Sequence, residues 1–134
     1  MNKKTEVLTI LVRIIGCHEV KGNGKTARMI IFDGDCDCEN FKGHILQGGV
    51  DSQKDFEGEP FSLSARYVLE GTDKENNPCR MFIENNGGIE NGIMKTTPMI
   101  VTDSPCLSYL QNEKLEGSIE GWEKGVIIHI FTLE

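Results

Sequence analysis

The sequence predicts an all-β protein, most simply a single antiparallel β-barrel of about nine to ten strands. Short apolar runs alternate with Gly, Asn, Asp and Pro turn residues from Glu6 to Leu133. No stretch keeps the apolar spacing of a helix over three turns. The length of 134 residues suits one hydrophobic core better than two, so residues 1–134 are expected to form one domain. A β-sandwich is the alternative architecture.

The N-terminal half predicts four strands separated by polar turns. Apolar residues at every second position indicate a first strand from about Glu6 to His18. The Asn23-Gly24 pair is typical of a hairpin turn after that strand. The next expected elements are strands at Arg28–Cys38, at Phe41–Gln53 with a bulge or bend at Gly48-Gly49, and at Phe61–Glu70, with an acidic loop at Lys54–Pro60.

The C-terminal half predicts shorter strands and one ambiguous segment. A turn at Asp73–Pro78 is followed by an expected strand at Cys79–Asn85, which Asn86-Gly87-Gly88 should end. The segment Ile89–Thr96 is ambiguous and has room for one helical turn. Short strands are expected at Pro98–Thr102 and Cys106–Gln111, and a final pair of strands at Leu115–Trp122 and Gly125–Leu133. The final strand is apolar on both faces. It is therefore expected to be buried on both sides, or to present its outer face to a second copy of the chain.

Composition and charge exclude several classes of protein. A net charge of −7 argues against a nucleic-acid surface, which needs clustered Lys and Arg. Nothing approaches a membrane span, and only six uncharged residues separate Glu6 from Arg13, fewer than a signal-peptide core needs. Five cysteines without regular spacing indicate reduced thiols in a cytoplasmic protein. No phosphate-binding, dinucleotide-binding or zinc-protease motif occurs, so no cofactor is expected.

Three segments occur in an order that resembles a family of small β-barrel proteins catalogued as domain of unknown function 3237. The matching segments are Gly48–Gln53, Ala65–Tyr67 through Asn85–Gly87, and Lys95–Pro98, followed by Leu107–Leu110 and by Gly117 and Gly121. The resemblance spans almost the whole chain. It implies a roughly ten-stranded antiparallel barrel, calycin-like in shape. It implies no particular activity.

The chain departs from that family in three places. Ser52 stands where the family often has Trp, and Asn86 stands where it often has Arg. The segment Ile89–Met94 is compressed. If the usual aromatic and Arg residues help to form a binding site, the site of this chain is altered or takes a different ligand.

Asp51 is the first candidate for a functional residue, because two glycines precede it and Gln53 shares its face of the strand. An inward-facing Asp51 would have a raised pKa and would act as an acid, a base or a ligand anchor. The alternative is that Asp51 caps the turn after the strand. Arg66 would recognise a carboxylate from inside the barrel, or would pair with Glu84 at the surface.

His129 is the second candidate for a catalytic residue. It shares a strand face with Ile127 and Phe131, which is typical of a core histidine with one hydrogen bond. If that face lines the barrel interior, His129 is the best candidate for a general base. The remaining candidate ligand-binding residues are Asn85, Lys95, Thr96 and Tyr109.

The segment Asp33–Glu39 resembles a metal site in composition but not in geometry. Strand alternation places its carboxylates on one face and Cys36 and Cys38 on the other, so one ion cannot take both sets. The spacing also does not fit a calcium loop. We therefore expect no metal here, but a charged strand end that discourages edge pairing, with two small thiols behind it.

Three hypotheses for function follow. The first is a barrel that binds a small, partly apolar molecule in its interior. The second is a cofactor-independent enzyme of the isomerase, cyclase or hydrolase class that uses Asp51 and a His for proton transfer. The third is a structural or interaction protein with a filled barrel. The face of strand Gly43–Gln53 that points inward distinguishes among them.

Overall fold

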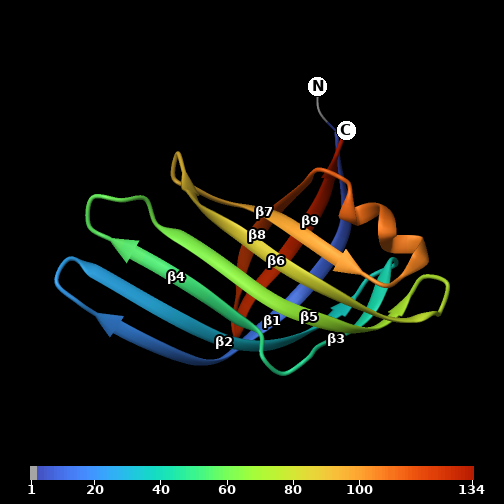
Figure 1. Ribbon diagram of the computed structural model, residues 1–134, viewed down its shortest axis with the longest axis horizontal. Coiled ribbons are helices and arrows are strands. Elements are labelled where there is room, and N and C mark those ends of the chain that lie inside the picture. Colours follow the sequence, from blue (N-terminus) through green and yellow to red (C-terminus); the bar gives the residue numbers. More distant parts are fainter. Residues whose placement is uncertain (1–2) are drawn as a thin grey trace.

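The computed structural model describes residues 3–134, and its nine strands form one antiparallel sheet that closes into a ring (Figure 1). The strands are β1 (Lys4–Lys21), β2 (Lys25–Asp37), β3 (Phe41–Ile45), β4 (Val50–Phe56), β5 (Ser62–Asp73), β6 (Pro78–Glu90), β7 (Ile93–Thr102), β8 (Leu115–Trp122) and β9 (Gly125–Leu133), and η1 (Pro105–Gln111) is a 3₁₀ helix. This confirms the predicted all-β barrel. No helix within the described residues is long and apolar enough to cross a membrane.

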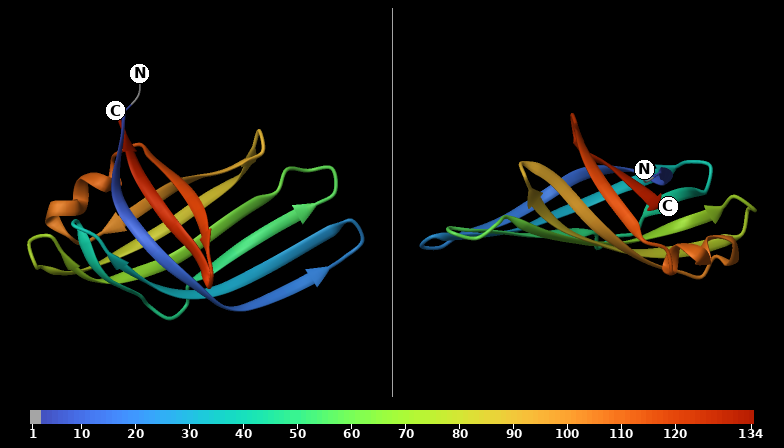
Figure 2. Two further views of the ribbon diagram at one scale, coloured as in Figure 1. Left: turned by 180° about the vertical axis from the view of Figure 1, so that it is seen from behind. Right: turned by 90° about the horizontal axis from the view of Figure 1, so that it is seen from above.

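The ring closes because β1 pairs with both β2 and β9. At one end of the barrel Lys4 lies opposite Leu133, where β1 begins and β9 ends (Figure 2). Strands β3 and β4 occupy one place in the ring, since both pair with β2 on one side and β5 on the other. The break between them contains Gly48 at a φ of +117°, a conformation that favours glycine. The predicted bend at this glycine pair is therefore confirmed.

Two predictions about local structure are wrong, and one ambiguous segment is resolved. The strand expected to end at Asn86-Gly87-Gly88 continues through these residues, since β6 extends to Glu90. The expected strand Cys106–Gln111 is the helix η1, because Pro105 has no N–H for a sheet ladder and Leu107 and Leu110 bury themselves at a helical spacing. The ambiguous segment Ile89–Thr96, which had room for one helical turn, forms a hairpin. Strands β6 and β7 run up to the pair Asn91-Gly92, whose φ angles of 52° and 77° suit a tight turn between antiparallel strands.

The barrel interior is filled mainly by alternate residues of each strand. The centre of this core consists of side chains with no exposed surface: Leu8, Ile10, Leu69, Met81 and Ile83. A β-bulge between Glu6 and Leu8 adds Val7 to the buried set, because the extra residue shifts the alternation of β1. The core gives way to open space toward one end of the barrel, which creates the site described next.

Candidate functional site

A cavity of about 110 Å³ lies inside the barrel, between residues of β1, β2, β4, β5, β6, β8 and β9. Its lining is mostly apolar and includes Val12, Ile14, Ile30, Phe32, Leu63, Ala65, Ile119, Val126 and Ile128. Three polar side chains complete the wall: Asp51, Gln53 and Asn85. The space has room for a few water molecules or one small organic molecule.

Strand register explains why these polar residues converge. Asp51 of β4 lies directly opposite Ala65 of β5, and Ala65 lies directly opposite Asn85 of β6. Adjacent strands are about 4.8 Å apart, so the Asp51 and Asn85 backbones are separated by about 10 Å. The methyl group of Ala65 occupies little of the space between them. The result is a pocket with a carboxyl at one side and a carboxamide at the other.

Asp51 is held in place by its neighbour on the same strand face. Gln53 Nε2 donates a hydrogen bond of 2.8 Å to Asp51 Oδ2, whereas the buried Asp51 Oδ1 has no hydrogen-bond partner. Burial raises the pKa of the Asp51 carboxyl, and the hydrogen bond from Gln53 opposes part of that rise. Asp51 can therefore hold or accept a proton at a partly buried site.

Asn85 faces the same space from β6, two strands away from Asp51. It is 1% exposed, and its Oδ1 has no hydrogen-bond partner. The buried Oγ1 of Thr96 is also without a partner. Gly117 lies so close to both that a Cβ at this position would come within 2.1 Å of Thr96 Oγ1 and 3.5 Å of Asn85 Oδ1. Buried polar atoms without partners are costly, and Asn85 Oδ1 is available to accept a hydrogen bond at the edge of the cavity.

The structure brings together only some of the residues that the sequence singled out. Asp51, Gln53 and Asn85 line the cavity, and Thr96 lies beside Asn85 near Gly117. Lys95 lies instead in a separate open groove of about 450 Å³ between the β6–β7 and β8 sides of the barrel.

Two of the remaining candidates lie outside the cavity. Arg66 is on the outer face of β5, where its Nε lies 3.1 Å from Glu84 Oε2 and its side chain is 61% exposed. This is the surface ion pair that the sequence offered as an alternative. Tyr109 lies on η1 and is 42% exposed. Neither side chain lines the cavity.

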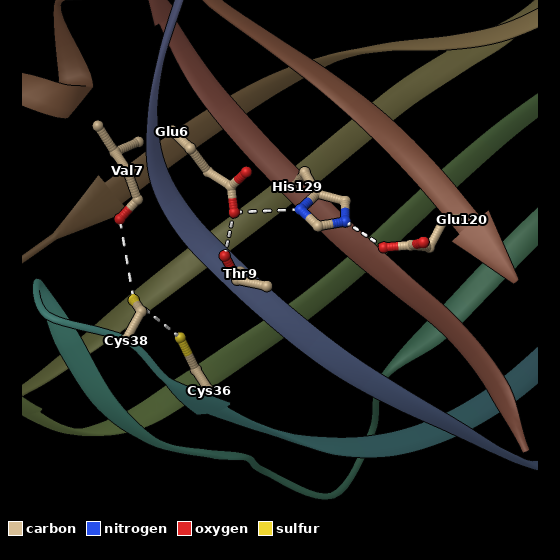
Figure 3. A network of polar contacts seen from close by, with 7 residues as sticks. All are labelled: Glu6, Val7, Thr9, Cys36, Cys38, Glu120 and His129. Carbon is tan, nitrogen blue, oxygen red and sulfur yellow. Dashed lines mark hydrogen bonds and ion pairs between the residues drawn. The ribbon is translucent and has the colours of Figure 1, made fainter. Parts of the chain in front are cut away.

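His129 lies on the outer face of β9, between two acidic side chains (Figure 3). Its Nδ1 is 3.1 Å from Glu6 Oε2, and its Nε2 is 2.7 Å from Glu120 Oε1. Ile128 and Ile130 take the inward positions of the strand. The proposed Asp51–His129 pair therefore does not form across the interior, because alternation along β9 points the imidazole away from the cavity.

The acidic strand end carries ion pairs rather than a cluster of ligands. Arg13 Nε lies 2.8 Å from Asp33 Oδ1, and Arg13 Nη1 lies 2.8 Å from Asp35 Oδ2. Lys42 Nζ lies 3.5 Å from Asp37 Oδ1. Among the residues that the structure describes, no group of three or more His, Cys, Asp and Glu side chains has the arrangement of a metal site.

Sequence reasoning missed the residues that shape the cavity without contributing chemistry. Ala65 leaves the space between Asp51 and Asn85, and Gly117 allows Thr96 to approach Asn85. Phe32 lines the cavity and packs edge-on against Tyr67, with ring centroids 5.5 Å apart. A small residue within a strand of larger ones was the signal for Ala65, but its importance depends on the cross-strand partners.

Comparison with known proteins supports the fold and leaves the activity open. No family model matches the chain, and no curated protein matches it. Solved structures match over nearly the whole length. A protein of unknown function from Clostridium acetobutylicum has a TM-score of 0.83 at 22% identity, over 98% of this chain and 99% of that one. A conserved protein of unknown function from Rhodopseudomonas palustris has a TM-score of 0.84 at 21% identity, over 100% and 99%.

A third similar structure is described as an enzyme from Penicillium herquei. Its TM-score is 0.79 at 10% identity, over 99% of this chain and 95% of that one. At these identities the likeness shows that the barrel fold is shared, and it gives no information about chemistry. The chain is thus a β-barrel, and the solved structures that it resembles include two proteins of unknown function and a protein described as an enzyme.

Proposed function

We propose that this barrel binds a small, partly apolar molecule in the cavity between Asp51 and Asn85. The observation that carries the proposal is the pair of buried acceptor atoms, Asp51 Oδ1 and Asn85 Oδ1, which lie two strands apart in the lining of an otherwise apolar cavity. A ligand with an apolar body and a hydrogen-bond donor would bury its body against the aliphatic lining. Its donor would satisfy an acceptor that is otherwise without a partner.

Phenol and toluene provide a direct test, because they have nearly the same shape and differ in one hydrogen-bond donor. Phenol at about ten times its Kd should stabilise the protein by about 1.4 kcal/mol, a rise of roughly 5 °C in the Tm. Toluene should stabilise it less. Thermal unfolding with each compound measures the difference. Equal effects of the two compounds would show that the polar wall does not recognise the ligand.

Two variants of neighbouring residues locate the binding. Ala65→Leu fills the cavity and should abolish the stabilisation by phenol. Arg66→Ala is the matched control, because it changes the next residue of β5 on the opposite, exposed face and costs less than about 1 kcal/mol. Asn85→Leu should remove the preference for phenol over toluene. Retention of phenol binding in Ala65→Leu would place the binding elsewhere and contradict the proposal.

A second candidate function is proton transfer without a cofactor, with Asp51 as the acid or base. The raised pKa of Asp51 inside a cavity favours it. Deuterium incorporation from D₂O into small carbonyl and phenolic compounds, followed by NMR, tests this idea. The exchange should depend on the protein and be lost in Asp51→Asn. Exchange that persists in Asp51→Asn would exclude this role.

The proposal also includes a family and a cellular location. Membership of domain of unknown function 3237 rests on the order of the three sequence segments, and a cytoplasmic location rests on five free cysteines. A purely structural role would favour a barrel filled by its own side chains, and the cavity argues against it. Phenol stabilisation that disappears in Ala65→Leu would also contradict that role.

A further inference from the structure

A pair of thiols lies at the junction of β2 and β3, apart from the cavity. Cys36 Sγ and Cys38 Sγ are 3.7 Å apart and face one another (Figure 3). Both cysteines are free, and neither lines the cavity. The sequence predicted two small thiols behind an acidic strand end, but not that they would be in contact.

The two thiols have different surroundings. Cys36 is 2% exposed and lies within the core, whereas Cys38 is only half-buried. The loop that carries Cys38 is fastened to β1, because Asn40 Nδ2 donates a hydrogen bond of 2.9 Å to the Val7 carbonyl. One thiol is thus accessible to a small reagent, and the other is positioned behind it.

The environment of Cys38 also suits a thiolate. As a thiol, Cys38 donates to the Phe41 carbonyl at 3.5 Å. As a thiolate, it accepts a hydrogen bond from Cys36 and from the backbone N–H groups of Thr9, Phe41 and Asn40, which together lower its pKa to about 6 against the opposing effect of burial. The interaction with Cys38 and burial raise the pKa of Cys36. Cys38 is therefore the nucleophile of the pair.

We propose that Cys36 and Cys38 form a redox-active dithiol that reduces small organic disulfides, with Cys38 attacking and Cys36 resolving. Attack by the Cys38 thiolate on a disulfide RSSR would form a Cys38–S–S–R bond and release RS⁻. Cys36 would lose its proton to this RS⁻ and attack Cys38 Sγ, which would form the Cys36–Cys38 bond and release a second RS⁻. That thiolate takes a proton from water. The protein thiols are oxidised, and RSSR is reduced to two thiols.

Charges around the dithiol favour neutral or cationic disulfides. Asp37 and Glu39 flank Cys38 in the sequence, and both are exposed. Lys42 lies 3.5 Å from Asp37 and offsets one of these charges. An anionic disulfide would still meet a negative surface on a chain of net charge −7. We expect cystamine to react faster than the neutral 2-hydroxyethyl disulfide, with a difference that shrinks at high salt.

The test begins with the unmodified folded chain and 2-hydroxyethyl disulfide. After the remaining thiols are alkylated, peptide mapping by mass spectrometry should find a Cys36–Cys38 disulfide. Formation of this disulfide should release two equivalents of thiol, in addition to the one released by each mixed disulfide at a single cysteine. The exposed Cys17 provides an internal comparison, because it is a single thiol and should stop at the mixed disulfide. Mixed disulfide that persists on Cys38 in the unmodified chain would overturn the proposal.

Variants separate the two roles. Cys36→Ser should trap the mixed disulfide on Cys38, and Cys38→Ser should lose the reaction of Cys36. Alkylation of Cys38 by iodoacetamide should level off at a lower pH in the unmodified chain than in Cys36→Ala, because alanine cannot donate a hydrogen bond to the Cys38 thiolate. An unchanged pH profile would contradict the pairing. The mapping of the unmodified chain decides the proposal even if Cys36→Ser fails to fold.

Discussion

Asp51 is the residue on which the functional proposal depends, and its position has a cost for stability. A carboxylate taken out of water loses hydration free energy, and here the hydrogen bond from Gln53 compensates only in part. Binding sites commonly carry such locally unfavourable groups, because a ligand then satisfies them. The raised pKa of Asp51 makes this cost measurable through the pH dependence of unfolding.

Asp51→Asn should stabilise the free protein at neutral pH. The folded-state pKa is raised, so the favourable contribution of protonated Asp51 is present below the unfolded-state pKa of about 3.9 and is lost as pH rises through the folded-state value. The free energy of unfolding of Asp51→Asn should exceed that of the unmodified chain at neutral pH, and the gap should close in acid. Urea unfolding followed by the fluorescence of Trp122, the single tryptophan, measures it.

Asp55→Asn is the matched control for that comparison. It removes the same charge from the exposed end of β4, beside Arg28 at 3.9 Å. No stabilisation at neutral pH is expected there. If Asp55→Asn and Asp51→Asn raise stability equally, the effect comes from net charge and the burial of Asp51 is not its cause.

His129 should also make stability depend on pH, but here because the folded protein favours the charged form of the side chain. Hydrogen bonds and charge from Glu6 and Glu120 raise the pKa of its imidazole. The stabilisation is therefore complete below the unfolded-state pKa of about 6.5 and is lost as pH rises through the raised folded-state pKa. His129→Gln should be destabilising in mild acid, by less than about 1 kcal/mol for each surface pair, and nearly neutral at alkaline pH. A constant difference between the two proteins across this range would contradict the ion pairing.

At the scale of elements, β7 and β8 have the shortest stretch of strand pairing in the ring. Thr96 and Gly117 form the one directly facing pair assigned between these two strands. The absence of a side chain at Gly117 allows this close approach, because a Cβ would come within 2.1 Å of Thr96 Oγ1. The join also borders the site, since Asn85 Oδ1 lies next to it.

Gly117→Ala should therefore destabilise the barrel by about 1–3 kcal/mol through overpacking at this join. Gly121→Ala on the same strand is the control, because nothing lies within 4 Å of its Cβ position. That substitution should be neutral or stabilise by about 0.4–1 kcal/mol through the unfolded state. Urea unfolding of both variants decides the point. Equal effects would show that the join tolerates a side chain.

Elements with strong local signals could be predicted, and others could not. The break between β3 and β4 follows from Gly48, whose positive φ few other residues adopt. The Asn91-Gly92 pair is typical of a hairpin turn, but the apolar runs on either side of it are short, so the two strands that it connects were not evident from the sequence. For η1, Pro105 before a Leu107–Leu110 pair was the signal, but a run this short fits a strand equally well.

The site was harder to predict than the fold, because strand alternation leaves the inward face undecided. In β4 both alternating sets contain polar residues, so Asp51 and Gln53 were candidates without a known direction. In β9 both sets are mainly apolar, so the sequence could not show that His129 points outward. The juxtaposition of Asp51, Ala65 and Asn85 depends on the register of three strands, which only the folded structure supplies.

On the scale of the whole molecule, closure of the ring has two consequences. It removes free strand edges, which would otherwise promote aggregation. It also encloses an interior that side chains fill at the end near Leu69 and leave open between Asp51 and Asn85. The same barrel thus has a packed core that stabilises it and a cavity suited to a ligand. The structural counterparts show that this architecture occurs with very different sequences.

Titration of isotopically labelled protein with phenol, followed through backbone amide NMR signals, tests the central claim most directly. Binding in the cavity should shift the signals of Asp51, Ala65 and Asn85 in a saturable way, with little change on the outer face around His129. Ala65→Leu should abolish these shifts. Shifts confined to the outer surface, or an interior whose signals do not respond to phenol, would contradict the proposal that this barrel binds a small molecule inside.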